Sequence, residues 1–428
     1  MRIAVIGSGI SGLSAAFRLQ TDHEVVLFES DSRPGGHTHT VDITLGGITA
    51  GVDTGFLVFN ERTYPLLIAL FAELGVPSAT TDMSFAASIG PHRIEWCGSN
   101  LASLFAQPSN LLRPGFWRML KDIIRFNREA TALAIDDASA QLRLEEPLER
   151  YLERERYSTD FRDAYLLPMA AAIWSCPTAT MMKFPLGSFV RFFHNHGLLQ
   201  IEGRPRWMTV PGGARQYVDK ILAQLADVRL ATPVLAVERG QGARGAVSVR
   251  TAQKTEIFDQ VVMACHSDQA LALLTDADEE ERALLGAIRY QPNRALLHTD
   301  SALMPARRRA WAAWNYLSDG NPGAPDVSVT YWLNRLQPLP FKEPVFVTLN
   351  PLQEPRPDAL IREISYAHPV FDIAAGRAQR RLRTKQGERG TWFAGAWMGY
   401  GFHEDGLRSG LEVAQALSRI APSLSRAA

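Results

Sequence analysis

Three glycines near the start of the sequence have the spacing of a phosphate-binding turn. Gly7, Gly9 and Gly12 stand in the run GSGISG, directly after the apolar stretch RIAVI. With this spacing, the first glycine permits a tight turn, the second lets the backbone approach a pyrophosphate, and the third lets a helix pack closely on a strand. The N-terminus of that helix would present unpaired N–H groups and a positive dipole end to phosphate. The run therefore predicts a dinucleotide site formed by Gly7, Ser8, Gly9, Ile10, Ser11 and Gly12.

An acidic residue and a second glycine pair follow at positions that suit the rest of a dinucleotide. Glu29 ends the strand-like run EVVLFE, where its carboxylate can accept hydrogen bonds from both ribose hydroxyls. Ser30 stands beside it, and Gly35 with Gly36 would bring further backbone N–H groups to the pyrophosphate. We expect these four residues to contact the bound nucleotide.

The order of these motifs resembles the flavin amine oxidase superfamily, in which an acidic residue and a short spacer precede a glycine doublet that is usually followed by arginine. Here His37 takes the arginine position, with Thr38 next to it. The run GVDTGFLVFN is similar to the family's segment under the flavin ring, so the resemblance implies Gly55 and Phe56 as flavin neighbours. TPVLAVER is similar to the strand that touches adenine, which implies Val234 as a contact.

The end of the chain carries a second match to the same superfamily. TWFAGAWMGYGFHEDGLRSGLEVAQAL resembles its C-terminal flavin motif, with a strand, a loop and a helix beginning near Asp405. The N-terminus of that helix would stabilise negative charge at flavin N1 and O2. The resemblance thus implies FAD as the cofactor and adds four contacts: Gly395, Asp405, Gly406 and Leu407. The residues within these motifs most resemble those of a bacterial subgroup known only as predicted NAD/FAD-binding proteins. Members of this subgroup are often encoded near cyclopropane-fatty-acyl-synthase-type enzymes.

The pattern along the chain predicts an α/β protein in which two domains are interleaved. β-branched, apolar runs predict strands over residues 2–6, 24–29, 229–238, 246–251, 260–265 and 391–394. A mainly helical block lies between 64 and about 200, and a helix followed by strand-like pieces lies between 268 and about 386. We expect a Rossmann-type FAD-binding domain, similar to that of glutathione reductase and amine oxidases, and an α+β substrate domain. The first comprises residues 1–63, 201–267 and 387–428, and the second comprises 64–200 and 268–386.

Four residues around the C-terminal loop are the candidates for catalytic, substrate-facing groups: Trp397, Tyr400, His403 and Glu404. Each also has a structural alternative, namely packing for the two large rings, a backbone hydrogen bond for the histidine and helix capping for the glutamate. Many amine oxidases place a lysine near flavin N5. The comparable stretch YQPNRALLHTD offers Arg294 and His298 but no lysine, which weakens a simple amine oxidase assignment.

Three functions remain open at this stage. An adaptable apolar lining rich in Met and Phe between residues 166 and 199, together with the subgroup resemblance, favours oxidation, desaturation or isomerisation of an unsaturated fatty acyl lipid by hydride transfer to flavin N5. The same segment could be plain core. The alternatives are an amine oxidase acting on a small amine or polyamine, and a non-catalytic lipid or partner binder of this fold, as in Rab GDP-dissociation inhibitors. With a single GxGxxG turn, we expect oxygen, a quinone or another protein as the electron acceptor.

Composition and residue spacing argue against several other kinds of protein and site. Lys plus Arg and Asp plus Glu balance at 45 each, so no whole-chain field draws the protein to nucleic acid. Cys97, Cys176 and Cys265 lie far apart without a CxxC pair, which argues against a redox disulfide or a cysteine metal cluster. The two HxH pairs lack a third ligand at suitable spacing, so we expect no metal site.

The expected location is the cytoplasm. No stretch reaches the roughly 18–20 apolar residues of a membrane helix. The segment 110–127, NLLRPGFWRMLKDIIRFN, predicts a basic amphipathic helix, and such a helix can lie on an anionic bilayer. Either a solvated surface helix or peripheral contact with the inner face of the membrane fits this pattern.

Overall fold

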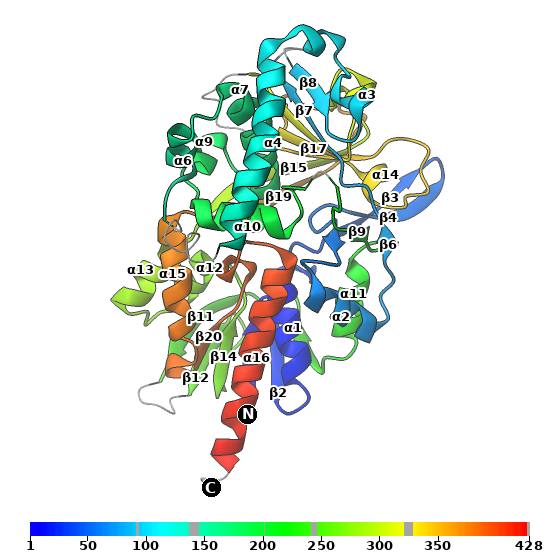
Figure 1. Cartoon of the computed structure of the whole chain (residues 1–428). Coiled ribbons are helices and arrows are strands. Elements are labelled where there is room, and N and C mark those ends of the chain that lie inside the picture. Colours follow the sequence, from blue (N-terminus) through cyan, green and yellow to red (C-terminus); the bar gives the residue numbers. More distant parts are fainter. Residues whose placement is uncertain (91–93, 137–144, 201, 241–245, 321–327, 426–428) are drawn as a thin grey trace.

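The computed structural model describes residues 1–90, 94–136, 145–200, 202–240, 246–320 and 328–425. Its first layer is a five-stranded parallel sheet in the lower half of Figure 1. The order across this sheet is β10 (Asp227–Arg229), β2 (Glu24–Phe28), β1 (Arg2–Ile6), β14 (Gln260–Met263) and β20 (Thr391–Phe393). Strands from the start, middle and end of the chain therefore lie side by side, as the Rossmann-type prediction requires.

Both faces of this sheet are covered, which explains why its strands are apolar at every position. In β1, Ile3 and Val5 face one core and Ala4 and Ile6 face another. The first face carries α1 (Ile10–Leu19), α2 (Pro65–Leu74), α11 (Arg215–Leu222) and α16 (His403–Ser425). The second carries α12 (Ser267–Leu273), α13 (Glu279–Gly286), α15 (Ile373–Thr384) and the small sheet of β11 (Val234–Arg239), β12 (Val247–Thr251) and β13 (Thr255–Phe258).

A seven-stranded, mostly antiparallel sheet forms the second layer, in the upper half of Figure 1. Its order is β19 (Leu360–Val370), β15 (Arg289–His298), β18 (Phe346–Leu349), β17 (Ser328–Trp332), β16 (Trp314–Ser318), β7 (Phe85–Ile89) and β8 (Ile94–Cys97). Helices of the 100–200 region cover it and share its core. They are α3 (Leu101–Leu104), α4 (Pro114–Ile135), α6 (Leu148–Arg154), α7 (Thr159–Phe161), α8 (Leu167–Trp174), α9 (Thr178–Met182) and α10 (Leu186–Asn195).

Short elements connect the two layers. A hairpin of β3 (Thr40–Leu45) and β4 (Ile48–Asp53) leads into a small sheet of β5 (Phe59–Asn60), β9 (Trp207–Thr209) and β6 (Ala79–Thr80). Helix α14 (Leu333–Leu336) follows β17 directly. Single helical turns occupy Pro108–Leu112, Arg162–Leu166, Ser301–Leu303, Arg308–Ala310, Glu388–Gly390 and Ala396–Met398.

One expectation about the elements was wrong in detail, and one was confirmed but incomplete. The strand expected over 229–238 is two strands, β10 and β11, because Ala231 adopts a left-handed backbone (φ 48°) and Pro233 cannot donate to a ladder. The block expected to be mainly helical contains β7 and β8. Strand β7 is stabilised by pairing with β16, which is more than 200 residues away, and β8 pairs with β7, and local sequence carries little signal for such pairing. The domain boundaries stay a prediction, and the one at residue 201 lies outside the described residues.

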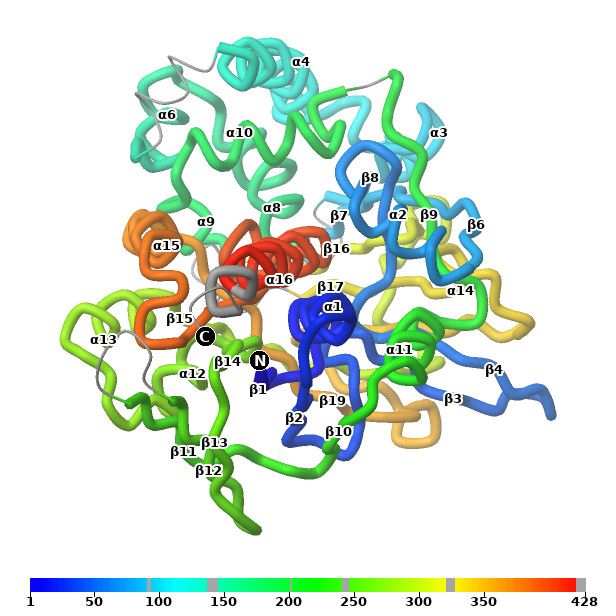
Figure 2. The backbone as a smooth tube through the Cα atoms, turned by 90° about the horizontal axis from the view of Figure 1, so that it is seen from below, coloured from blue at the N-terminus to red at the C-terminus, as the bar shows by residue number. Residues whose placement is uncertain are grey.

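The two ends of the chain meet where α16 packs on α1. A Cβ atom added to Gly410 would lie 2.2 Å from the backbone oxygen of Ser11 and 2.3 Å from Ser14 Oγ, and one on Gly406 would lie 2.8 Å from Ile10 Cγ2. Only glycine allows this approach at position 410. Figure 2 shows the two helices side by side near the centre of the molecule.

Asp53, at the end of β4, bonds to the facing strand of its own hairpin and to two segments elsewhere in the chain. Its carboxylate accepts hydrogen bonds from Thr40 Oγ1 (2.5 Å), the backbone N–H of Ala214 (3.0 Å) and Gln337 Nε2 (2.8 Å). These partners belong to the hairpin, the start of α11 and the end of α14. Asp53 is only 1% exposed, and burial raises its pKa to about 7 despite these donors.

We expect Gly410→Ala to destabilise the protein by about 1–3 kcal/mol, because the new methyl group must force α16 away from α1. Gly376→Ala is the matched control. It also lies inside a helix, but its nearest neighbour is a flexible arginine tip at 3.8 Å, so the control gains about 0.5–1 kcal/mol from helix propensity. Denaturant titration of both variants measures the difference, and equal effects would show that the two helices do not approach as described.

The Asp53 carboxyl predicts a pH dependence of stability. Because its folded pKa lies above the ordinary value of 3.8, the folded state holds the proton more tightly, and the stabilisation present at low pH is lost as pH rises from about 4 to about 7. The Asp53→Asn variant has no carboxyl to titrate at this position, so its stability does not fall for this reason. The unfolding free energy of the wild type minus that of the variant should therefore fall across this window, by up to about 4 kcal/mol. A difference that stays constant with pH would mean that Asp53 is ionised throughout.

Candidate functional site

The turn after β1 has the form of a phosphate cradle. Helix α1 begins after Gly9, which has no side chain to cap the first N–H groups, so these donors are available to an anion. The space beside Gly9 is open, with no atom within 4 Å of an added Cβ. Gly12 packs closely on the turn, since its added Cβ would lie 1.9 Å from the Gly7 oxygen. These features fit the pyrophosphate of a dinucleotide.

The acidic residue and the glycine doublet close around the same turn. Glu29 Oε2 accepts hydrogen bonds from Ser8 N (2.8 Å) and Ser8 Oγ (2.5 Å), while Ser30 Oγ lies 3.2 Å from Oε1. Gly36 has a left-handed backbone (φ 56°), and an added Cβ would lie 3.1 Å from Gly9 Cα. The doublet and the first turn therefore form one glycine-lined surface, with the Glu29 carboxylate at its edge.

His37 lies half-buried in a cluster of aromatic and imidazole rings. Its ring stacks on Tyr366 (centroids 5.1 Å apart) and lies 5.3 Å from His368 and 6.2 Å from His266. Burial, followed by the neighbouring imidazoles, holds the pKa of His37 well below its usual value. Its Nε2 atom is buried with no hydrogen-bond partner. A buried polar atom without a partner is rare in native proteins, so a polar group of a bound cofactor fits here.

A hydrogen-bonded chain links the doublet to the C-terminal helix. Thr38 Oγ1 lies 2.5 Å from Tyr217 OH, which lies 2.8 Å from His403 Nε2. Phe56 stacks on the His403 ring at 3.9 Å. Burial lowers the pKa of His403 to about 3, so the ring is neutral when it shares this hydrogen bond with the tyrosine. His403 thus positions the start of α16 through side chains, whereas its structural alternative was a backbone hydrogen bond.

Two other candidates from the C-terminal loop hold backbone in place. Trp397 is 2% exposed, and its indole N–H donates to the Cys265 oxygen at 3.0 Å. Both carboxylate oxygens of Glu404 accept backbone N–H groups, from Leu66 at 2.9 Å and Leu67 at 3.0 Å. These N–H groups open α2, which has no side-chain cap of its own. Glu404 therefore caps α2 and not its own helix. A catalytic role for Trp397 and Glu404 stays a prediction.

Asp405 shapes the loop in front of α16. Its Oδ2 atom accepts the backbone N–H groups of Tyr400 (3.1 Å) and Phe402 (3.0 Å), and burial raises its pKa to about 6. Helix α16 begins at His403, two residues before the expected start. The Asp405 side chain is thus turned back toward its own loop.

The other expected cofactor contacts lie around this centre. The Phe56 N–H donates to the His37 oxygen at 2.9 Å, which places Gly55 beside the doublet. Thr232 N donates to the Glu29 oxygen at 2.8 Å, so the segment leading to Val234 lies at the ribose end. Gly395 N donates to Ser409 Oγ at 3.1 Å. Gly406 and Leu407 follow Asp405 in α16, where the Leu407 side chain is fully buried in the core, which leaves its backbone as the group that could reach a cofactor.

Two residues of the site were not found from the sequence. The Arg33 guanidinium donates to the backbone oxygens of Gly36 (2.8 Å) and Thr38 (3.1 Å), and so fixes the doublet loop. Its place just before PGGH was a usable signal. Tyr217 on α11 carries no local signal, because its partners lie about 180 residues away in each direction.

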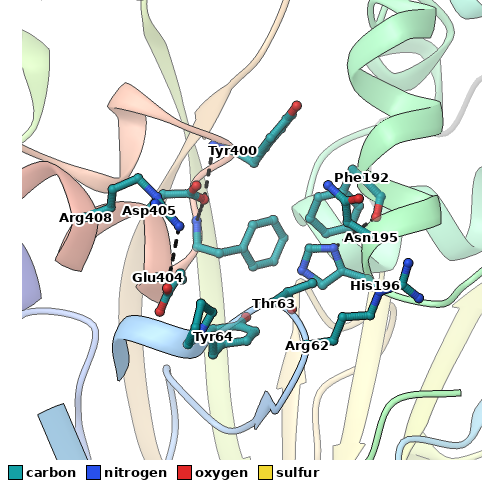
Figure 3. Close-up of a pocket in the computed structure, with 12 residues that line it drawn as sticks. Arg62, Thr63, Tyr64, Phe192, Asn195, His196, Tyr400, Glu404, Asp405 and Arg408 are labelled. Carbon is teal, nitrogen blue, oxygen red and sulfur yellow. Dashed lines mark hydrogen bonds and ion pairs between the residues drawn. The ribbon is translucent and has the colours of Figure 1, made fainter. Parts of the chain in front are cut away.

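A cavity of about 420 Å³ opens between the starts of α2 and α16 and the end of α10. Aromatic and polar side chains share its lining, and the catalytic candidates Tyr400 and Glu404 are both among them (Figure 3). Arg62 and Arg408 lie on opposite sides of these aromatic rings in Figure 3. The lining residues are Arg62, Thr63, Tyr64, Pro65, Phe192, Asn195, His196, Tyr400, Phe402, Glu404, Asp405 and Arg408.

Most of the apolar block between 166 and 199 is core. Trp174, Met181, Phe189 and Phe193 are buried and pack on one another. Phe192 is the member of this group that reaches the cavity. In the described ranges, no three His, Cys, Asp or Glu side chains are placed to hold a metal ion. No helix in that part of the chain has the length and apolar character to span a bilayer.

Glu404→Ala separates capping from catalysis. As a cap of α2, the residue should contribute about 1–2 kcal/mol to stability, and its loss should leave turnover per bound flavin close to that of the wild type. Asp278→Ala is the matched control, because Asp278 caps α13 by accepting Glu281 N at 2.7 Å. A drop in turnover of roughly 10²–10⁴, the range for an acid–base group, in Glu404→Ala alone would assign it to catalysis.

Comparison with known proteins agrees with this geometry. The model of the flavin containing amine oxidoreductases matches residues 10–312. No curated protein matches the sequence. Among solved structures, the CLA-producing fatty acid isomerase from P. acnes has a TM-score of 0.66 at 15% identity, with 98% of each chain covered.

Two amine oxidases share the fold to the same degree. Cyclohexylamine oxidase from Brevibacterium oxydans IH-35A has a TM-score of 0.67 at 16% identity, with 98% of this chain and 99% of that chain covered. Putrescine oxidase bound to putrescine has a TM-score of 0.69 at 14% identity over the same shares. The family match spans more than half of the chain. The chain therefore belongs to the flavin-containing amine oxidoreductase family and is an FAD-dependent oxidoreductase.

Proposed function

We propose that this enzyme acts on a hydrophobic substrate with an anionic end, an unsaturated fatty acyl lipid, which it oxidises, desaturates or isomerises. One observation carries the proposal: the cavity at the C-terminal loop has a guanidinium group on each side, from Arg62 and from Arg408, which also lies 3.6 Å from the Glu404 carboxylate. Arginine is well suited to hold carboxylate or phosphate oxygens. Phe192, Tyr400 and Phe402 would pack along an acyl chain.

The acidic residues of the cavity do not favour an amine. Glu404 already accepts two backbone N–H groups of α2, and Asp405 accepts two from its own loop. Burial also raises the pKa of both carboxyls, which weakens them as partners for an ammonium group. Arg408 also lies 3.6 Å from Glu404, so a cationic substrate would meet the Arg62 guanidinium and no carboxylate without a partner among the lining residues described.

The missing lysine has no replacement near the cavity. The Arg294 guanidinium is paired with Glu354 and Glu363 on the outside of β15. His298 is buried on the same strand and bonds to Thr348 Oγ1 at 2.8 Å. Neither residue lines the cavity. These placements support a chemistry other than standard amine oxidation.

Bound FAD would supply an acceptor for a hydride or for electrons from a substrate carbon. The chain's own residues would bind the anionic end at Arg62 and Arg408, orient the acyl chain on Phe192 and Phe402, and exclude water with these rings. Burial raises the pKa of Tyr400, so its hydroxyl stays protonated and can donate a hydrogen bond. Oxygen, a quinone or another protein would then take the electrons if the reaction is a net oxidation.

Amine oxidation is the second candidate, supported by the likeness to putrescine oxidase and cyclohexylamine oxidase. Anaerobic incubation of the FAD-loaded enzyme with an unsaturated fatty acid, putrescine or cyclohexylamine separates the two. We expect diene absorbance and mass spectrometry to reveal either a conjugated isomer with the flavin left oxidised, or an oxidised or desaturated lipid with one flavin bleached per product, and we expect the flavin bands to be unchanged by amines. Bleaching of the flavin bands by amines, with no lipid product, would make amine oxidation the better-supported function.

The anionic end can be tested with one variant. Losing a hydrogen bond to a charged group costs roughly 1.5–3 kcal/mol, so Arg62→Gln should raise KM for the free acid by about tenfold or more and leave the methyl ester unaffected. Arg206→Gln is the matched control, since Arg206 pairs with Glu61 outside the cavity. Equal KM values for acid and ester in the wild type would contradict an anion subsite.

A further inference from the structure

Helix α4 carries an outward face on which apolar and basic side chains alternate. Its 22 residues span about 33 Å. Its inward residues, among them Phe116, Met119 and Phe126, are buried where α4 packs against α7 and α10. Figures 1 and 2 show the helix along the periphery of the molecule. The outward residues, all exposed, are Pro114, Trp117, Arg118, Lys121, Ile124, Arg128, Ala132 and Ile135.

Exposed apolar side chains are concentrated at this face. Trp117 is 50% exposed and Ile124 is 62% exposed, and Leu112, in the turn before α4, is 87% exposed. Trp117 Nε1 donates to the Leu111 oxygen at 2.9 Å, which joins that turn to the helix. Six of the thirteen exposed large apolar residues in the described ranges lie between 101 and 135. Such concentration marks an interaction surface.

The outward row of α4 is basic, although two of its cations have acidic neighbours. Arg118, Lys121 and Arg128 stand among the apolar residues, with Arg118 paired to Asp160 at 2.8 Å and Arg128 lying 3.8 Å from Glu129. The acidic residues of α4 bond to neighbouring parts of the protein. Asp122 accepts a hydrogen bond from the backbone N–H of Ser158 at 2.9 Å, and Glu129 accepts one from the Tyr157 hydroxyl at 2.6 Å. The partner must therefore be anionic and must also accept apolar side chains.

An anionic bilayer meets both conditions better than a protein does. The cores of protein interfaces are depleted in lysine and other charges, whereas interfacial helices alternate aromatic or aliphatic groups with Lys and Arg that reach the headgroups. The packing of α4 on α10 also places the bilayer one helix away from Phe192, Asn195 and His196 of the candidate cavity.

We propose that the outward face of α4, with the preceding turn at Leu111 and Leu112, docks the enzyme on the surface of an anionic phospholipid bilayer. Trp117, Ile124 and Leu112 enter the headgroup and acyl boundary. Arg118, Lys121 and Arg128 contact lipid phosphates. Docking goes beyond the proposed function and does not require it, because binding to a bilayer can be measured without turnover.

Co-sedimentation of the FAD-loaded enzyme with vesicles tests this docking. We expect binding to vesicles that contain phosphatidylglycerol and at least tenfold weaker binding to pure phosphatidylcholine. The charge variant Arg118→Gln, Lys121→Gln, Arg128→Gln should lose at least tenfold in affinity for the anionic vesicles, since each basic residue near the surface contributes on the order of fivefold. The apolar variant Leu112→Ser, Trp117→Ser, Ile124→Ser should lose binding to both.

Leu235→Ser with Ile257→Ser is the matched control, since these exposed apolar residues lie on the β11–β13 sheet. This variant should bind as the wild type does. Unchanged flavin absorbance and thermal melting show that each variant is folded. Equal affinity for the two kinds of vesicle, or equal losses in the control, would overturn the proposal. A dimer in light scattering that the apolar variant abolishes would assign the face to a second copy of this chain.

Discussion

The close approach of α16 to α1 is the contact on which the site depends. Gly410 lies against the backbone of Ser11 and Gly406 lies against Ile10, so the first turns of the two helices lie close together. Since each helix start carries unpaired N–H groups and a partial positive charge, two anion-stabilising ends converge from opposite ends of the chain. A side chain between the helices would separate them, and the cofactor surface would lose one half.

The remaining contacts hold loops against that centre. Arg33 fixes the glycine doublet, Glu404 caps α2, and Tyr217 joins Thr38 to His403. These groups bond to backbone or to each other, so they set the geometry of the site. The other lining groups of the cavity are the aromatic rings and two guanidinium groups, of which Arg408 also pairs with Glu404. This division is the basis for proposing an anionic, apolar substrate rather than an amine.

The sequence predicted those features whose cause is local. Spacing of glycines sets a turn, and an apolar run followed by a carboxylate sets a strand and its end, so the region from Gly7 to Gly36 was predicted closely. The partners of Glu404 and Tyr217 lie far away in the chain, and no local pattern encodes them. The pairing of β7 with β16 was missed for the same reason, since tertiary contacts decide short strands. FAD was implied by resemblance and is supported by the family match.

Hydrogen–deuterium exchange of the enzyme with and without FAD tests the central claim most directly. If both chain ends form one cofactor surface, FAD should protect backbone amides in the glycine turn at 7–14, the doublet loop at 34–38 and the C-terminal segment at 395–410 together, with one shared dependence on FAD concentration. Protection confined to the first two segments would contradict the account, because the C-terminal helix would then pack on α1 without contacting the cofactor.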